Sequence, residues 1–286
     1  MIKIQFFMSS RLLSKIIKKI CNIKENRYNQ YEISKKLQNL KESALRNNQN
    51  EKASQIWCLQ EAVLVHTNYF SAFSNLKNHN FYEAWCDLEL VEKGLWSITP
   101  PQTHLPDYWS EVWIKGQYYF IEEHTSKWQK LYPYHLFCST EETFKEYCSV
   151  CNKEINPRKP CGHKDGEIYN GEMRMRVLKD IKIHALSLVE NPARKFSVPF
   201  LSDPQSGDTI DHYDYKLVRY LSNLLNHPFQ KWDYEITTID RDYNYFKSLG
   251  ISDEDSCPCE SGKKYKDCCI NTTIATPHYQ FKIEPT

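Results

Sequence analysis

Apolar positions in the first half of the chain recur every three or four residues, which is the spacing of one face of an α-helix. This pattern predicts helices at about residues 29–47, 51–77, 81–97 and 109–130. Pro100 and Pro101 end the third of these helices, because proline cannot continue a helix. The first half of the chain is therefore expected to form a helical domain.

A separate apolar stripe lies near the N-terminus, where leucines and isoleucines between Leu12 and Ile20 share one helix face and Lys15, Lys18 and Lys19 oppose it. A basic amphipathic helix of this kind, within residues 10–24, can lie on an anionic membrane surface. The interpretation that we favour is an ordinary packing helix. The lysines interrupt the apolar core that a secretory signal needs, which predicts a cytoplasmic protein without a transmembrane segment.

The second half of the chain shows shorter patterns. The apolar run Ala185–Val189 predicts a strand, and the alternation that begins at Trp232 predicts another. One short helix is expected at about residues 213–225, and residues 273–286 are expected to form a flexible tail. A mixed α+β fold follows from this change of pattern.

Composition narrows the function classes. The chain has 37 basic and 36 acidic side chains, so no global field attracts nucleic acid or membrane. The usual glycine-rich nucleotide loops are absent from the sequence. It contains 11 cysteines, and in a reducing compartment clustered cysteines indicate metal binding more than disulfides. Cys21, Cys58, Cys86 and Cys138 stand apart from the clusters and are expected to be small buried apolar residues.

A C-terminal cluster reads C-P-C-E-S-G-K-K-Y-K-D-C-C and contains Cys257, Cys259, Cys268 and Cys269. Zinc takes four thiolates in a tetrahedron, and two cysteine pairs can supply them if the intervening chain reverses direction. Ser261-Gly262 permits that reversal, and the following lysines offset the thiolate charge. Since four protein ligands leave no open position, the predicted zinc site is structural.

These thirteen residues resemble the SEC-C motif, whose usual pattern is C-P-C-G-S-G-K-K-Y-K-x-C followed by Cys or His. The motif is named for the C-terminus of the translocase motor SecA, where it contacts a chaperone and anionic lipid. The resemblance implies the same four zinc ligands and, by analogy, a chaperone or translocation component as partner. Glu260 stands where the family usually has Gly, and the ATPase motifs of the motor are absent.

A second cluster contains Cys148, Cys151, Cys161 and His163, spaced as C-x-x-C, nine residues and C-G-H. This donor set is typical of a zinc ribbon, and two zinc ions per chain are therefore predicted. Buried thiols beside an unrelated histidine are the alternative. A catalytic deaminase site is disfavoured, because its H-x-E and P-C-x-x-C elements are missing. Residues 132–198 also resemble uncharacterised bacterial proteins with a central zinc ribbon and a terminal SEC-C tag.

The patterns combine into an α+β protein with an N-terminal helical region, a central zinc ribbon with short strands and a helix, and a C-terminal SEC-C zinc module. The predicted segments are a basic amphipathic segment at 1–27, a helical domain at 28–135, a zinc-ribbon domain at 136–250, the SEC-C module at 251–272 and the tail at 273–286.

The function favoured by the sequence is a zinc-binding, non-enzymatic protein that docks a macromolecular partner through two structural zinc modules. Two alternatives stay open. One is a zinc-ribbon protein that binds nucleic acid or the ribosome. The other is an enzyme of unknown reaction with a site outside the zinc modules, for which the candidates are His184, Asp211, His212 and Asp214.

Overall fold

The computed structural model describes residues 11–24, 28–100, 105–259 and 261–285. The chain forms two compact units, Met1–Leu224 and Leu225–Thr286. The finer division into five segments stays a prediction. The expectations for residues 1–10 and for Glu260 lie outside the described residues.

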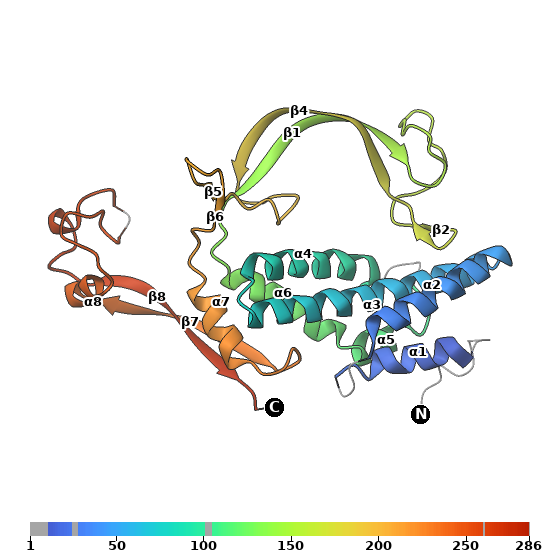
Figure 1. Cartoon of the computed structure of the whole chain (residues 1–286), viewed down its shortest axis with the longest axis horizontal. Coiled ribbons are helices and arrows are strands. Elements are labelled where there is room, and N and C mark those ends of the chain that lie inside the picture. The colour runs from blue at the N-terminus through green and yellow to red at the C-terminus, as the bar shows by residue number, and fades with distance from the viewer. Residues whose placement is uncertain (1–10, 25–27, 101–104, 260, 286) are drawn as a thin grey trace. The chain divides into compact units, whose positions relative to one another are not determined.

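The first unit contains the predicted helices (Figure 1). They are α1 (Arg11–Cys21), α2 (Gln30–Arg46), α3 (Asn50–Lys77), α4 (Phe81–Ile98), α5 (Trp109–Lys115), α6 (Tyr118–Leu131) and α7 (Lys216–Leu224). The apolar side of α1 is buried apart from Leu12, with Ile17 and Ile20 at 0% exposure, so α1 is a packing helix as favoured above. No helix in the described part of the chain is both long enough and apolar enough to span a bilayer.

The single helix predicted for residues 109–130 is wrong, because the backbone breaks between α5 and α6. Gln117 adopts a left-handed conformation with φ of 64°, which no α-helix can include. The Gly116 amide donates to the Val112 carbonyl at 2.7 Å and closes α5. A Cβ atom at Gly116 would lie 2.7 Å from that same carbonyl oxygen, so only glycine fits the turn.

A long two-stranded ribbon follows the helices and was only partly predicted. β1 (Phe137–Cys148) pairs antiparallel with β4 (Arg176–Val189), and Figure 1 shows the pair as one curved ribbon. The predicted strand at 185–189 is the last third of β4. Two pairs of short strands complete the sheets of this unit: β2 (Ile168–Tyr169) pairs with β3 (Glu172–Met173), and β5 (Leu201–Ser202) pairs with β6 (Thr209–Ile210).

The β1–β4 ribbon is anchored to the helices at both ends. Past the end of β4, the buried Glu89 carboxylate on α4 accepts hydrogen bonds from the Lys195 and Phe196 amides at 3.0 and 2.7 Å. At the other end, Lys41 on α2 pairs with Glu172 at 2.5 Å. Between these anchors the side chains of β4 are exposed, and Leu186 is 74% accessible.

The second unit is built on another two-stranded ribbon. β7 (Trp232–Arg241) pairs antiparallel with β8 (Ile274–Ile283) along its whole length, and α8 (Tyr243–Ser248) and the 3₁₀ turn η2 (Tyr265–Asp267) lie between them in sequence. The prediction of a flexible tail at 273–286 is therefore wrong for residues 274–283. Apolar side chains of β8 alternate along the strand and lie opposite Trp232, Tyr234 and Ile236, which gives the segment a reason to pair.

Candidate metal centres

The terminal cluster brings four thiols together. The Sγ atoms of Cys257, Cys259, Cys268 and Cys269 all lie within 4.8 Å of one another. Cys268 Sγ is 3.5 Å from the sulfurs of both Cys259 and Cys269. Four sulfurs about 2.3 Å from a tetrahedral zinc are about 3.8 Å apart, so the observed spacing fits zinc.

Local backbone structure holds this arrangement. The Cys257 amide donates to the Lys263 carbonyl at 2.8 Å, which closes a narrow turn around the first two cysteines. Gly262 has φ of 75° and supplies the predicted reversal. The return segment is the short 3₁₀ turn η2. The Cys268 amide bonds to the Tyr265 carbonyl, so η2 leads directly into the second cysteine pair.

A very small core supports the cysteines. Phe246 on α8, Tyr265 and Ile274 cluster with Cys257, and the Tyr265 ring is fully buried at 0% exposure. The Phe246 and Tyr265 rings meet edge to face with centroids 5.9 Å apart. Sequence reasoning missed Phe246, because Phe246 lies outside the cysteine motif. So few buried side chains cannot order the module without a further contribution, which a zinc ion held by the four cysteines would supply.

Charges around the terminal cluster differ from the expectation. Lys264 and Lys266 both pair with the Glu254 carboxylate, at 2.7 and 2.5 Å. They are therefore partly neutralised and not devoted to the thiolates. The Ser261 hydroxyl lowers the pKa of Cys259 to about 6 by donating a hydrogen bond to its sulfur, and neighbouring thiols act in the same direction. Because of this lowered pKa, the Cys259 thiol is largely a thiolate at neutral pH, which is the form that binds metal.

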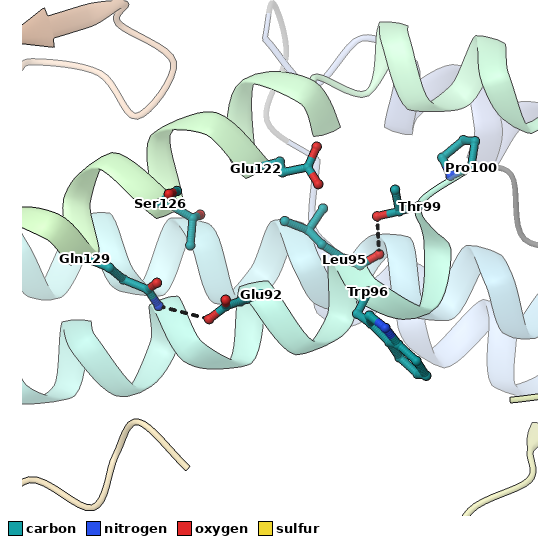
Figure 2. Close-up of a pocket in the computed structure, with 9 residues that line it drawn as sticks. Glu92, Leu95, Trp96, Thr99, Pro100, Glu122, Ser126 and Gln129 are labelled. Atoms are coloured by element: carbon teal, nitrogen blue, oxygen red, sulfur yellow. Dashed lines mark hydrogen bonds between the residues drawn. The ribbon is translucent and has the colours of Figure 1, made fainter. Parts of the chain in front are cut away.

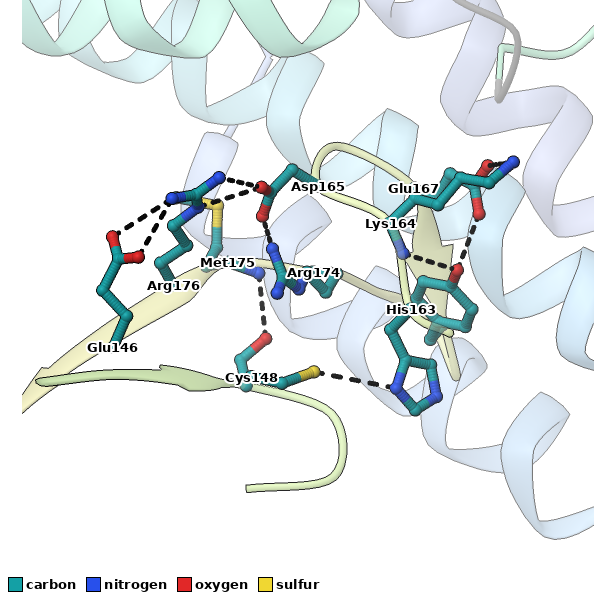
Figure 3. Close-up of polar contacts among 11 residues, drawn as sticks. Glu146, Cys148, His163, Lys164, Asp165, Glu167, Arg174, Met175 and Arg176 are labelled. Atoms are coloured by element: carbon teal, nitrogen blue, oxygen red, sulfur yellow. Dashed lines mark hydrogen bonds and ion pairs between the residues drawn. The ribbon is translucent and has the colours of Figure 1, made fainter. Parts of the chain in front are cut away.

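The central cluster is also assembled. One ligand atom from each of Cys148, Cys151, Cys161 and His163 lies within 4.8 Å of the others. The Cys148 sulfur is 3.7 Å from His163 Nδ1 (Figure 3), close to the roughly 3.6 Å that sulfur and nitrogen ligands of one tetrahedral zinc would show. Cys148 ends β1, and the loop that precedes β2 carries the last two members.

A tyrosine and a glutamate hold the histidine loop in place. The Tyr169 ring packs edge-on against the His163 imidazole with centroids 4.7 Å apart. Its hydroxyl donates to Glu167 at 2.6 Å and accepts from the Lys164 amide at 3.1 Å. Outer contacts of this kind orient a metal ligand and limit its motion.

Arg174 is a second residue beside the clusters that sequence reasoning missed. Its side chain is 4% exposed and forms an ion pair with Asp165, which also accepts from Arg176 at 2.8 Å (Figure 3). Burial raises the pKa of Cys148, but hydrogen bonds from the Cys151 amide and from Arg174 outweigh it and bring the pKa to about 6. Arg174 thus places a buried positive charge beside a cluster that would carry net negative charge with zinc bound. No sequence pattern singled out Arg174, which lies well before the strand predicted at 185–189.

The candidate residues for an enzyme site have structural partners. His184 Nε2 lies 3.0 Å from the Thr143 hydroxyl on the opposite strand. Asp211 accepts from the Tyr215 hydroxyl at 2.7 Å and from the Tyr213 amide at 3.1 Å, and Asp214 accepts from the Lys216 amide. The structure does not bring His184 together with these carboxylates in any described hydrogen bond.

Among the four cysteines outside the clusters, Cys58 is buried, and Cys21 and Cys86 are half-buried. The expectation of burial is wrong for Cys138, which is exposed because its side chain lies on the open face of β1.

These geometries define a protein with two four-ligand centres, each of which could hold a zinc ion. The sequence model of the SEC-C motif matches residues 255–271, which include all four cysteines of the terminal cluster. The chain therefore carries a SEC-C motif at its C-terminal end. No curated protein and no solved structure matches the chain.

Proposed function

We propose that this chain is a non-enzymatic zinc protein that docks a macromolecular partner through its two zinc modules. The observation that carries the proposal is that each Cys/His cluster occupies the loop end of a two-stranded ribbon. Residues 149–175 close the β1–β4 ribbon, and residues 242–273 close the β7–β8 ribbon. Each ribbon therefore carries a small metal-bound head.

A structural role for the metal follows from the donor sets. Each cluster offers four protein ligands, and zinc filled by four protein ligands keeps no position for water or substrate. In this proposal Cys148, Cys151, Cys161 and His163 hold one ion, and Cys257, Cys259, Cys268 and Cys269 hold the other. Zinc then supplies rigidity to heads that have little apolar core of their own.

The central head offers a charged surface for docking. Lys153, Arg158 and Lys159 are exposed on its loop, and none of them forms an ion pair with a residue that the structure describes. A protein surface with exposed carboxylates would complement these cations. By analogy with the SEC-C motif of the translocase motor, a chaperone or translocation component is the partner class we favour.

The same three cations support nucleic-acid or ribosome binding as a second candidate. Phosphate contacts make such binding fall steeply as salt rises. Association with duplex or ribosomal RNA measured between low and physiological salt therefore separates the two candidates. If the chain does not associate with RNA at low salt, nucleic-acid or ribosome binding is excluded.

Zinc binding by the two clusters is tested by measuring the metal content of the reduced, purified full chain. Wild type is expected to hold two zinc ions, and Cys148→Ser and Cys257→Ser are each expected to hold one. Cys138→Ser is the matched control, because it removes an exposed thiol outside both clusters and should keep two ions. A wild-type protein without zinc refutes the proposal.

Docking through the zinc modules should be tested with point substitutions and not with a truncation. Deleting residues 250–286 would remove β8 as well as the module, and β8 is the pairing partner of β7. Crosslinked partners of wild type should therefore be compared with those of Cys257→Ser and Cys148→Ser, with Cys138→Ser as control. Partner sets that do not change in either zinc-deficient variant contradict docking through the modules.

A further inference from the structure

The tip of the central head rests on two helices of the same unit. β2 and β3 form a hairpin whose turn residues, Asn170 and Gly171, have φ values of 52° and 69°, as a tight two-residue turn requires. A Cβ atom at Gly171 would lie 3.1 Å from Ala53 Cβ on α3 and 3.1 Å from Lys41 Cδ on α2, so the turn packs closely on both helices. The next residue, Glu172, forms the ion pair with Lys41.

This ion pair covers a buried lysine. The Lys41 side chain is 7% exposed, whereas the Glu172 side chain is 68% exposed. A buried ammonium group needs a neighbouring negative charge, because its desolvation is costly. Glu61 on α3 is a second such neighbour: burial raises the pKa of its carboxyl, the charge of Glu172 raises this pKa further, and Lys41 opposes both. Lys41 therefore keeps a carboxylate nearby if Glu172 moves away.

The hairpin is held from its other side by the central cluster (Figure 3). Tyr169 in β2 packs its ring against the imidazole of His163. Arg174, which directly follows β3, hydrogen-bonds through its side chain to the Cys148 sulfur. A hairpin with two residues in each strand is not stable by itself in water. Its shape therefore depends on the loop that carries the metal ligands.

The opposite end of the β1–β4 ribbon is held by more contacts. Past the end of β4, Lys195 Nζ donates to Glu92 at 2.5 Å and to Gln129 at 2.9 Å. Figure 2 shows Glu92 on α4 hydrogen-bonded in turn to Gln129 on α6. These bonds add to the two that the Glu89 carboxylate accepts from the backbone of the same loop. The head end is thus the end of the ribbon that can separate from the helices when its contacts weaken.

We propose that the β2–β3 hairpin is a latch that the central cluster controls. While the four ligands hold zinc, the hairpin keeps its shape and stays closed on α2 and α3. When the metal is lost, the ligand loop no longer fixes Tyr169 and Arg174, the hairpin leaves the helices, and Lys41 becomes accessible to solvent. This inference rests on zinc binding by the central cluster, but it does not depend on docking of a partner.

The test is pulse acetylation of lysines on the reduced full chain, with the rate at each lysine read by peptide mass spectrometry. Lys36 is the internal reference, because it also lies on α2 and pairs with a glutamate, but its side chain is 41% exposed. In the zinc-loaded wild type, Lys41 should react about tenfold more slowly than Lys36, because its reaction requires local opening. Cys161→Ser removes a central ligand and should raise the Lys41 rate about tenfold while the Lys36 rate stays the same.

Two further variants separate the latch from the metal. Cys257→Ser removes a ligand of the terminal cluster and should leave Lys41 protected. Glu172→Gln keeps every metal ligand, so it should retain both zinc ions and raise the Lys41 rate about threefold.

Three results would overturn the latch. They are equal Lys41 rates in wild type and Cys161→Ser, a Lys41 as reactive as Lys36 in the zinc-loaded wild type, and loss of the helical circular dichroism signal in Cys161→Ser, since the hairpin would then not open separately. None of these contradicts zinc binding. A wild type that holds no zinc at the central cluster would overturn zinc binding and the latch together.

Discussion

His66 is a buried histidine whose protonation should control the acid stability of the helical unit. It lies on α3 at 0% exposure. Its Nε2 atom is 2.8 Å from the Gly116 carbonyl and its Nδ1 atom is 2.8 Å from the Tyr28 hydroxyl. Because a carbonyl only accepts, Nε2 must carry the proton and Nδ1 must accept from Tyr28. The neutral imidazole therefore satisfies both neighbours.

The magnitude follows from the pKa. Burial lowers the pKa of His66 from 6.5 to about 4, although the hydrogen bond to Gly116 acts in the opposite direction. The unfolded chain therefore takes up a proton near pH 6.5, while the folded chain does not until about pH 4. The stability from the neutral, buried ring is fully present above pH 6.5 and is lost as pH falls towards 4. The loss is about 2 kcal/mol at pH 5 and about 3 kcal/mol at pH 4.

The assay is urea unfolding followed by circular dichroism at 222 nm, at several pH values between 7.5 and 5. Helices α1 to α7 belong to the first unit and only the six-residue α8 belongs to the second, so this signal reports the unit that contains His66. His66→Gln keeps an amide donor but cannot titrate. Its free energy of unfolding should fall by about 2 kcal/mol less than that of wild type between pH 7.5 and 5.

His135→Gln is the matched control, because His135 is exposed and its replacement should leave the wild-type pH dependence unchanged. Parallel curves for wild type and His66→Gln would refute the reasoning. Such a result would mean that the folded protein accommodates the imidazolium, for example by moving Tyr28.

Three further predictions concern the anchors of the ribbons. Arg174→Met should lower the zinc affinity of the central cluster about 10- to 100-fold, as loss of an outer contact does, while the terminal cluster keeps its affinity in chelator competition. Glu89→Gln cannot accept from both loop amides, so it should lower the free energy of unfolding by about 1–3 kcal/mol in urea titrations; unchanged stability would contradict the anchoring role. Deleting residues 274–286 should remove the hydrogen-exchange protection of β7 amides, and retained protection would show that β7 does not need β8.

The helical half was predictable from sequence because its signal is local. Each stripe of apolar residues lies within one helix, and α2, α3 and α4 appear within a few residues of their expected bounds. The break at Gln117 was not predictable in this way, since neither proline nor a glycine pair marks it. Its cause is tertiary, because the Gly116 carbonyl is needed as the acceptor for the buried His66.

The strands were harder to predict, because their stability comes from partners distant in sequence. β1 reads F-C-S-T-E-E-T-F-K-E-Y-C, which has too few apolar positions to be recognised as a strand. It forms only because β4 pairs with it after the connecting residues 149–175. β8 was taken for a tail for the same reason. The candidate metal ligands could be proposed from the sequence because a cysteine motif is local, whereas Arg174 and Phe246 come close to the clusters only through the fold.

The two metal clusters occupy the positions where the ribbons most need support. A two-stranded ribbon is marginally stable in water, because each strand has one unpaired edge and little apolar surface is covered. Each ribbon here is held at its open end. Contacts from Glu89 hold the chain that follows β4. In the β7–β8 ribbon, the side-chain amide of Gln230 donates to the Glu284 carbonyl at 3.0 Å. At the loop end of β7–β8, the cysteine cluster and its few-residue core are the main fixed structure. Removal of zinc should therefore fray the β7–β8 ribbon from its loop end towards Trp232, and the surface proposed for docking would be lost before the strands separate.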